Sequence, residues 1–385
     1  MYKKKIAILG STGHIGEESL KIISKNKSQF SVEFLLCNRN FKKIIKQINQ
    51  FNPKYVFVSD FIIFAKLKKK KLKKKTIFLN KIEDIVSLKN NLFFDISILA
   101  TSGLSCFYIN FLFVEISKKL LIANKETVIC GNKLFINKCK KFKTDVFSLD
   151  SEHYCLNELL KKEKKININK YYITASGGPF FRKKFSYYKK AKINKTLVHP
   201  KWKMGKKISI DSATMVNKIF EVFEASILYD IKVDKINIKI HPDALVHSFV
   251  TLNNGLVKFI AHDTNMRIPI SNNLMDKNYY FKNIFLNNDL INLSFFSPDP
   301  AKFKVLKLIP LINKYGHSGI IIFNILNDFL VYKYLDNKIF FYEIEKKLIK
   351  IFSLKIVKKF CVKKIKNIND IRKTFLFAEN LCLKT

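Results

Sequence analysis

Cysteine patterns that form disulfides or bind metals are absent from the 385-residue sequence. Its 7 cysteines are scattered, their number is odd, and no two of them form a CxxC pair. A small disulfide-stabilised scaffold is therefore excluded, and the pattern suits a reducing compartment better than a cysteine zinc site. Hydrophobic residues make up 48% of the chain and charged residues 26%. This composition excludes a disordered or collagen-like chain, and the length suffices for two or three domains.

Long uninterrupted apolar runs are also lacking. The first apolar run, Ile6–Leu9, is too short for the hydrophobic part of a signal peptide, so a cytoplasmic location is expected. The uncharged stretch Ile96–Val114 approaches membrane-spanning length, but the turn signal Thr101-Ser102-Gly103 interrupts it. We interpret this stretch as a buried strand, a turn and a helix, and we expect no membrane partner.

Acidic residues are scarce compared with basic ones. The chain has 30 Asp and Glu against 71 Lys and Arg, a formal net charge of +41. Such a charge is usual in proteins that bind nucleic acid or anionic membranes. Most of the excess is lysine, however, and Ile, Asn, Phe and Tyr are also abundant, a set that A/T-rich codons encode. The charge, including the run Lys66–Lys75, therefore does not by itself indicate a nucleic-acid partner.

Strand-like and helix-like segments alternate through the first part of the chain, which is typical of a doubly wound parallel α/β sheet. After about Asp299 the sequence loses glycine turns and becomes apolar-periodic, which predicts a helical C-terminal region. The Lys-, Asn- and Ile-rich segment Leu159–Lys170 is expected to be a surface connection. Strands are expected at Lys5–Leu9, Val32–Cys37, Tyr55–Val58, Ile96–Ala100, Leu120–Ala123 and Val146–Leu149.

A glycine-rich turn follows the first expected strand and precedes a helix expected to start at Glu17. Its sequence is Gly10-Ser11-Thr12-Gly13-His14-Ile15-Gly16. A dinucleotide pyrophosphate would lie here on backbone N–H groups, although GxxGxxG spacing also suits a plain tight turn. The second strand is followed by Asn38, Arg39 and Asn40 rather than by an acid. Because Arg39 suits a 2′-phosphate, NADP(H) is favoured over NAD.

Two acidic residues, Asp150 and Glu152, flank Ser151 at the end of an apolar run. On an extended chain their side chains would point the same way, and with Glu221 they would make an oxygen site for Mg²⁺ or Mn²⁺. If the segment around Glu221 is helical, Asn217 and Lys218 share its face. An ordinary strand-end acid and a capped amphipathic helix are the alternatives.

Three further polar segments are candidates. Ser176 precedes a glycine turn and could present its hydroxyl to an anion, or the segment could be a plain loop. His199 and Trp202 lie in a polar segment that suits a closing lid, although Trp202 could equally anchor the loop to the core. His241 and His247 are expected to be structural, with acid–base chemistry as the alternative.

In combination, these segments resemble the 1-deoxy-D-xylulose 5-phosphate reductoisomerase family of the non-mevalonate isoprenoid pathway. The matching runs occur in family order over roughly residues 1–275. They are Gly10–Gly16, Ala123–Thr127, Asp150–His153, Thr174–Phe180, His199–Gly205, Asp211–Glu221, His241-Pro242, His247-Ser248 and Met266–Ile270.

The resemblance implies three domains and a homodimer. The domains would be an NADPH-binding Rossmann-like domain over residues 1–149, a catalytic α/β domain with the dimer contact over 150–290, and a helical domain over 300–385. The implied activity converts 1-deoxy-D-xylulose 5-phosphate into 2-C-methyl-D-erythritol 4-phosphate by rearrangement of the carbon skeleton and reduction by NADPH, with Mg²⁺ or Mn²⁺.

The resemblance also implies a role for each candidate residue. The cofactor set is Gly10, Ser11, Thr12, Gly13, His14, Ile15, Gly16, Asn38, Arg39, Asn40, Asn124, Glu126 and Gly205. The metal set is Asp150, Glu152 and Glu221. The substrate set is Lys125, Ser151, Glu152, Ser176, His199, Trp202, Ser212, Asn217, Lys218 and Glu221. Catalysis would rest on Lys125, Asp150, Glu152, Glu221 and His199.

Three positions depart from the family pattern. His14 replaces the usual Ser, Asn38 the usual Gly, and Ala244 the usual Ser. None is an implied metal ligand, so activity is expected to be retained. Two other functions stay open from sequence alone: another NADP-dependent Rossmann reductase acting on a phosphorylated sugar or semialdehyde, and a basic polyanion-binding protein. Neither of these functions explains the three carboxylates at positions 150, 152 and 221.

Overall fold

The computed structural model describes residues 2–70, 76–183, 187–188, 191–202, 204–275 and 293–384. The chain divides into two compact units. Unit 1 comprises Met1–Thr127, Phe135–Asp150 and Asn265–Phe281, and unit 2 comprises Val128–Leu134, Ser151–Thr264 and Lys282–Thr385. Residues 71–75 of the lysine run and the expected boundary at residue 290 lie outside the described residues. The division into three domains stays a prediction.

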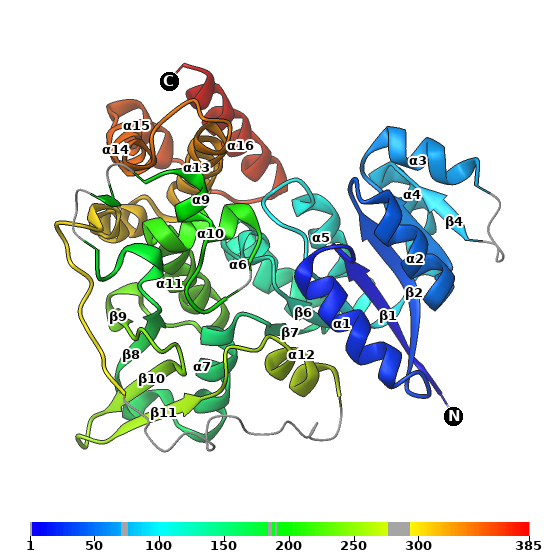
Figure 1. Ribbon diagram of the computed structural model, residues 1–385, viewed down its shortest axis with the longest axis horizontal. Coiled ribbons are helices and arrows are strands. Elements are labelled where there is room, and N and C mark those ends of the chain that lie inside the picture. The colour runs from blue at the N-terminus through cyan, green and yellow to red at the C-terminus, as the bar shows by residue number, and fades with distance from the viewer. Residues whose placement is uncertain are drawn as a thin grey trace. The chain divides into compact units, whose positions relative to one another are not determined.

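Unit 1 is an alternation of strands and helices, as the sequence predicts (Figure 1). Its strands are β1 (Lys4–Leu9), β2 (Phe30–Cys37), β3 (Tyr55–Val58), β4 (Ile77–Leu79), β5 (Phe94–Leu99), β6 (Ser117–Ile122) and β7 (Asp145–Ser148). Its helices are α1 (His14–Lys25), α2 (Phe41–Phe51), α3 (Phe61–Lys68), α4 (Ile82–Leu88), α5 (Phe107–Phe113), most of α6 (Lys125–Phe142) and α12 (Arg267–Leu274).

The seven strands form one parallel sheet in the order β4-β3-β2-β1-β5-β6-β7. The chain winds outward from β1 to β4 and then returns to β5 beside β1, so the sheet is doubly wound, as predicted. Ligands of such sheets bind where this order reverses, beyond the carboxyl ends of the strands. Leu9 and Leu99 pair in register, so the turns after β1 and β5 leave the sheet at the same level.

The core of unit 1 explains why its strands are readable from sequence. Strands buried on both faces of a parallel sheet are continuous apolar runs rather than alternating ones. The last four residues of β1, Ile6–Leu9, and all four of β3 are buried. α1, α2 and α12 pack on this core through residues such as Leu20, Ile44 and Ile270. Only β4, three residues long and beside the lysine run, escaped the sequence analysis.

The apolar stretch Ile96–Val114 folds as expected, into the end of β5, a turn and α5. Phe113 of α5 packs on Phe34 and Phe94 of the sheet, with ring centroids 5.1 and 5.6 Å apart. Across the described ranges, the structure contains no helix that is both long and apolar enough to span a bilayer.

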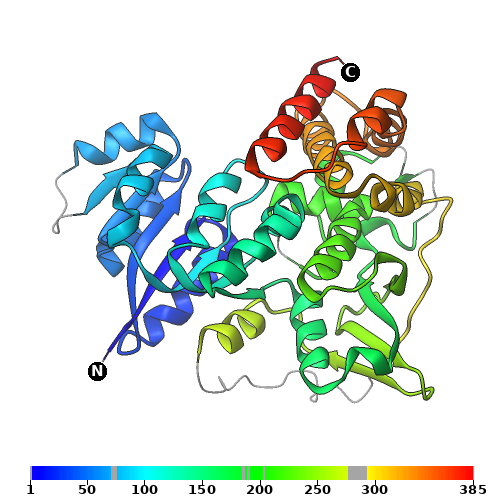
Figure 2. The same cartoon turned by 180° about the vertical axis from the view of Figure 1, so that it is seen from behind.

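Unit 2 combines a smaller sheet with a helical region, seen from both sides in Figures 1 and 2. Its strands are β8 (Ile168–Ala175), β9 (Ile236–Ile240), β10 (Val246–Leu252) and β11 (Val257–Ala261). Its helices are α7 (Ser151–Lys162), α9 (Ile193–Thr196), α10 (Lys206–Thr214), α11 (Val216–Tyr229), α13 (Ile309–Leu335), α14 (Phe341–Phe352), α15 (Lys355–Cys361) and α16 (Ile368–Leu383).

The four strands are ordered β11-β10-β8-β9, with β8 and β9 parallel and β10 antiparallel to β8. α7 and α11 pack on this sheet through Leu156 and Val222, which share a core with Ile173 and Val250. The expected surface connection at Leu159–Lys170 is wrong, because α7 continues to Lys162 and β8 begins at Ile168. Leu159 is buried in this core, and its packing stabilises the last turn of the helix.

The helical C-terminal region is confirmed: α13 packs against α14, α15 and α16. α13 also meets α10 through a buried polar network. Lys207 Nζ lies 3.0 Å from both Asp211 Oδ2 and Asp328 Oδ1, and Asn327 Nδ2 donates to Asp211 Oδ1 at 2.7 Å. Because a buried charge needs a partner, this network fixes α10 against the long helix.

Candidate functional site

The glycine-rich turn of unit 1 is shaped by close backbone approaches. Gly10 has φ +89°, and a Cβ there would lie 2.3 Å from Ala100 O, after β5. A Cβ on Gly16 would lie 2.5 Å from Gly10 O. Only glycine meets both requirements. The helix begins at His14, three residues before the expected start, because the chain turns directly into α1 at Gly13.

The turn has the features that a dinucleotide requires. No side chain caps α1, so the first backbone N–H groups of this helix have no capping acceptor. Ser11 is fully buried, and its Oγ has no hydrogen-bond partner among the described residues. Thr12 is half-buried, and Gly13 and His14 are exposed. The bulkier side chain of His14 therefore points to solvent and does not fill the turn.

The segment after β2 keeps a cation accessible. Asn38, Arg39 and Asn40 are exposed, and the Arg39 side chain is 81% accessible to solvent. Arg39 Nε pairs with Asp60 Oδ2 at 3.0 Å. A backbone hydrogen bond from Ile63 and this guanidinium lower the pKa of Asp60. Asn40 caps α2, because its side chain accepts a hydrogen bond from Lys43 N.

Asn124 is used as a structural residue at the start of α6. Its Nδ2 donates to Thr101 O and Gly103 O at 2.8 and 2.9 Å, and its Oδ1 accepts from the amide and hydroxyl of Thr127. These four bonds use the full capacity of the side-chain amide. Any contact of Asn124 with a cofactor would therefore involve its backbone. Glu126, two residues on, is buried.

Lys125, which is buried, and Asp150, which is half-buried, form an ion pair at the edge of unit 1. Lys125 Nζ lies 2.8 Å from Asp150 Oδ2, and the two side chains are 6% and 15% exposed. Asp150 follows β7, and its backbone N–H donates to Ser148 Oγ at 3.2 Å. Lys125 and Asp150, both candidates from the sequence, thus form an ion pair with each other.

The local geometry expected for Asp150 and Glu152 is wrong. α7 begins at Ser151, so Glu152 lies in the first turn of a helix and not on an extended chain. An acidic side chain there is stabilised by the positive end of the helix dipole. Ser151 Oγ donates to Glu152 Oε2 at 2.5 Å. The two carboxylates still come together, because the chain turns between them.

Glu152 and Glu221 share one ammonium group. Lys218 Nζ lies 2.5 Å from Glu221 Oε2 and also donates to Glu152 Oε1. Asn217 Nδ2 donates to Glu221 Oε1, which confirms that Asn217, Lys218 and Glu221 share one face of α11. Lys218 and Glu221 are 7% and 1% exposed. Asp150 precedes α7 by one peptide bond, and one carboxylate oxygen each from Asp150, Glu152 and Glu221 lies within 4.8 Å of the others.

Two residues that hold α7 against α11 and β10 were not predicted from the sequence. His153, fully buried on α7, bonds through Nε2 to Glu221 O at 3.0 Å, and its Nδ1 lies 3.7 Å from Glu224 Oε2. Ser248 Oγ donates to Glu152 O at 2.5 Å. His153 and Ser248 belong to the matching runs, but their partners lie 68 and 96 positions away and gave no local signal.

Ser176 and His199 are hydrogen-bonded, with Ser176 Oγ 2.9 Å from His199 Nε2. His199 Nδ1 accepts from the backbone N–H groups of Lys201 and Trp202 at 3.2 and 2.9 Å, so the proton of the neutral ring is on Nε2. Burial and the charge of Lys218 lower the pKa of His199 to about 4, which keeps it neutral. Ser176 Oγ also accepts from Gly178 N at 3.2 Å. Its own O–H is therefore left to donate to an anion.

The remaining candidates lie around α10. Ser212 is half-buried and follows Asp211, which the network with α13 holds in place. Gly205 is the residue before α10, and a Cβ there would meet nothing within 4 Å. Trp202 is half-buried, with its ring 6.0 Å from that of His247.

The histidines after β9 are packed in the core of unit 2. His241 is fully buried, and its Nδ1 contacts Ser294 O at 2.9 Å. The His247 ring stacks on His262 at 4.1 Å. Ala244, where the family usually has Ser, adopts φ +52°. This packing agrees with the structural interpretation of His241 and His247.

Comparison with protein families gives one consistent result. The family model described as 1-deoxy-D-xylulose 5-phosphate reductoisomerase matches residues 6–132. Two models of C-terminal domains of the same enzyme match residues 146–229 and 263–375. The chain is 40% identical over 375 residues to 1-deoxy-D-xylulose 5-phosphate reductoisomerase of Pelagibacter ubique, covering 96% of each chain. It is 32% identical to the enzyme of Sulfurihydrogenibium, covering 95% of this chain and 94% of that one.

Solved structures show the same similarity. A crystal structure of DOX-P reductoisomerase in complex with NADPH, fosmidomycin and magnesium matches with a TM-score of 0.91 and 27% identity, covering 99% of both chains. The Zymomonas mobilis enzyme in complex with NADPH matches with a TM-score of 0.85 and 25% identity, covering 100% of this chain and 98% of that one.

Proposed function

Because the chain belongs to the 1-deoxy-D-xylulose 5-phosphate reductoisomerase family, we propose that it converts 1-deoxy-D-xylulose 5-phosphate into 2-C-methyl-D-erythritol 4-phosphate. NADPH is the reductant, and Mg²⁺ or Mn²⁺ is the metal. The observation that carries this proposal is the convergence of three carboxylates with Lys125 and Lys218. A simple reductase of an aldehyde or ketone has no use for such a cluster.

The donor set suits a hard divalent cation. Asp150, Glu152 and Glu221 offer only carboxylate oxygens, the ligand type that Mg²⁺ and Mn²⁺ prefer. When bound, the metal acts as a Lewis acid toward the substrate's oxygen atoms. Lys125 pairs with Asp150, and Lys218 pairs with Glu152 and Glu221, so the two ammonium groups balance part of the negative charge of the carboxylates. Ser151, Lys125 and Glu152 contact the oxygenated carbons of the substrate.

The cofactor site is proposed at the glycine turn of unit 1. The buried orphan Oγ of Ser11 and the approaches at Gly10 and Gly16, which a Cβ would block, suit a pyrophosphate. Gly13, Thr12, His14 and Ile15 hold its phosphates, and the exposed Arg39, flanked by Asn38 and Asn40, holds the 2′-phosphate. Asn124, Glu126 and Gly205 complete the set. Bound there, NADPH would supply hydride for the reduction.

The substrate phosphate is held by hydroxyl, amide and ammonium donors. Ser176 donates its O–H because its oxygen already accepts from His199 and Gly178. Ser212, Asn217 and Lys218 provide the other contacts. Binding energy from this non-reacting phosphate orients the reacting carbons. Trp202 and His199 lie on one loop, whose closure over the substrate would exclude water. The homodimer and the cytoplasmic location remain predictions.

The test follows NADPH absorbance with purified protein and 1-deoxy-D-xylulose 5-phosphate, with and without Mg²⁺ or Mn²⁺. We expect metal-dependent oxidation that Asp150→Asn abolishes. A matched control is Asp145→Asn, which changes an exposed aspartate at the start of β7. A folded protein that binds NADPH but oxidises none of it would refute the proposed substrate.

A further inference from the structure

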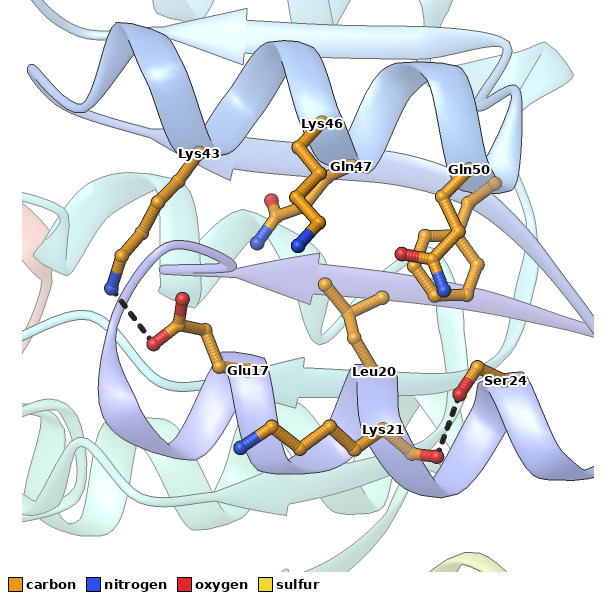
Figure 3. A pocket seen from close by; sticks show the side chains of 9 residues that line it. Glu17, Leu20, Lys21, Ser24, Lys43, Lys46, Gln47 and Gln50 are labelled. Atoms are coloured by element: carbon orange, nitrogen blue, oxygen red, sulfur yellow. Dashed lines mark hydrogen bonds and ion pairs between the residues drawn. The ribbon is translucent and has the colours of Figure 1, made fainter.

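The α2 side of the glycine turn contains polar contacts that the proposed mechanism does not use. α1 and α2 flank a groove of about 160 Å³, lined by Glu17, Leu20, Lys21, Ser24, Lys43, Lys46, Gln47, Gln50 and Phe51 (Figure 3). Ligand sites for drug-sized molecules have volumes of about 300–1,000 Å³. The groove is therefore too small for a dinucleotide, and its polar residues need another explanation.

Gln47 is the most informative of these residues. It is 7% exposed, and its Nε2 donates to Ser11 O at 2.8 Å. Its Oε1 has no hydrogen-bond partner in the described ranges of the chain. Burying an amide is costly unless it forms hydrogen bonds. The hydrogen bond from Gln47 to Ser11 O, in the glycine turn, is thus the interaction that offsets part of the cost of burying this amide.

Lys43, one helical turn earlier on α2, contacts the next carbonyl of the same turn. Its Nζ lies 3.4 Å from Thr12 O and 2.8 Å from Glu17 Oε2 on α1. Figure 3 shows Lys43 and Gln47 extending from α2 toward α1, with Lys43 ending at Glu17. Two successive carbonyls, of Ser11 and Thr12, are therefore held from one helix.

The backbone amides on the other side of the turn are anchored to β2. Gly10 N and Ser11 N both donate to Leu36 O at 2.9 Å. Gln47 and Lys43 add to this anchoring, because they bind the carbonyls of Ser11 and Thr12. α2 itself begins directly after Arg39 and Asn40. One helix thus connects the proposed 2′-phosphate site to the proposed pyrophosphate site.

We propose that Gln47 and Lys43 are positioning residues that, from α2, hold the glycine turn in its cofactor-binding conformation. This inference rests on the proposed NADPH site. In this role Gln47 acts through Ser11 O, and Lys43 acts through Thr12 O and Glu17. Because both act on the pyrophosphate turn, their loss weakens NADPH and NADH binding by the same factor. Loss of Arg39 weakens NADPH binding alone.

The experiment uses two matched pairs of variants of the full chain. Gln47→Leu is compared with Gln50→Leu, and Lys43→Ala with Lys46→Ala. Gln50 and Lys46 are exposed, line the same groove and lie on the same helix. Calorimetric titration with NADP⁺ and NAD⁺, without substrate or metal, gives the dissociation constants. Thermal unfolding verifies that each variant is folded.

We expect the dissociation constant of NADP⁺ to rise about tenfold in Gln47→Leu and about threefold in Lys43→Ala. The ratio of the NADP⁺ to the NAD⁺ dissociation constant should stay at the wild-type value in both variants. Gln50→Leu and Lys46→Ala should bind like wild type. Arg39→Ala should raise the ratio of the NADP⁺ to the NAD⁺ dissociation constant, which separates the pyrophosphate turn from the 2′-phosphate site.

A second readout needs no cofactor. Hydrogen–deuterium exchange in the peptide covering residues 10–16 should be faster in Gln47→Leu and Lys43→Ala than in their controls. Unchanged binding and unchanged exchange in folded variants would overturn the proposal. If Gln47→Leu does not fold, the exposed Lys43 pair decides the outcome alone. Failure of wild type to bind either nucleotide would instead refute the proposed cofactor site.

Discussion

The two polar sites of this protein are built in different ways. The glycine turn of unit 1 is made of seven consecutive residues and acts mainly through its backbone. The cluster of Glu152, Lys218 and Glu221 in unit 2 is made of side chains, and Glu152 and Lys218 are 66 positions apart. The conformation of the turn depends on the absence of a Cβ at Gly10 and Gly16, where a Cβ would collide with backbone atoms. The cluster depends on charges that balance one another.

This difference determines how each site should fail. A backbone site fails when added atoms force the chain out of shape, so its loss should also lower stability. A cluster of buried charges fails when one partner becomes neutral, even if the fold persists. The first two substitutions below each test one side of this contrast, and the next two test the neighbouring Ser176–His199 pair; they run from the largest expected effect to the smallest.

Glu221→Gln should have the largest effect. The variant keeps the size of the side chain but removes a carboxylate from the group at 150, 152 and 221. We expect kcat to fall at least about a hundredfold, because electrostatic stabilisation of the reacting oxygens is lost. NADP⁺ binding should not change. Glu158→Gln is the control, since Glu158 forms a surface ion pair with Lys161. Equal kcat values for the two variants would contradict the assignment.

Gly10→Ala should damage the fold and the cofactor site together. At φ +89°, with a Cβ 2.3 Å from Ala100 O, the turn must shift. We expect a loss of at least about 2 kcal/mol in the free energy of unfolding. Gly13→Ala is the comparison, because its Cβ would lie 3.3 Å from Gly10 O and its φ is −83°. Chemical denaturation measures both, and similar losses would show that backbone shape does not limit the turn.

Ser176→Ala should act on substrate binding alone. A hydrogen bond to a charged group contributes about 1.5–3 kcal/mol, so the KM for the phosphorylated substrate should rise at least about tenfold. The KM for NADPH is the internal control and should stay the same. Steady-state kinetics with each substrate varied in turn measures the two values. An equal rise in both would show that Ser176 supports the fold rather than the phosphate.

His199 should give the smallest effect, visible as a pH dependence of stability. Its pKa is lowered from 6.5 to about 4 in the folded protein, mainly by burial. The unfolded chain therefore binds the proton more readily, and stability is lost as the pH falls from about 6.5 toward 4. His199→Gln should flatten this part of the curve of unfolding free energy against pH. An unchanged slope would show that other groups cause it.

Much of the fold is readable from the sequence because its signals are local. The buried strands of unit 1 are continuous apolar runs, and all six expected strands of this unit are confirmed. Their ends differ by at most three residues from those observed. The start of α7 was missed, because Asp150-Ser151-Glu152 directly after a strand suggests its continuation as readily as a helix start. The composition of Leu159–Lys162 concealed the last turn of this helix.

The candidate site was only partly predictable. Helical spacing places Asn217, Lys218 and Glu221 on one face, and the structure confirms it. The contact of His153 with Glu221 and that of Gln47 with Ser11 could not be predicted, because each joins residues far apart in the sequence. Such partners depend on how helices pack on the sheets, and no periodicity encodes that.

The most direct test of the central claim is a titration of Mn²⁺ followed by electron paramagnetic resonance in wild type and in Glu221→Gln. The claim is that the carboxylates at 150, 152 and 221 hold a divalent metal independently of the glycine turn. We predict one Mn²⁺ site in wild type and in Gly13→Ala, and its loss in Glu221→Gln while NADP⁺ binding persists. Equal Mn²⁺ binding by wild type and Glu221→Gln would contradict the claim.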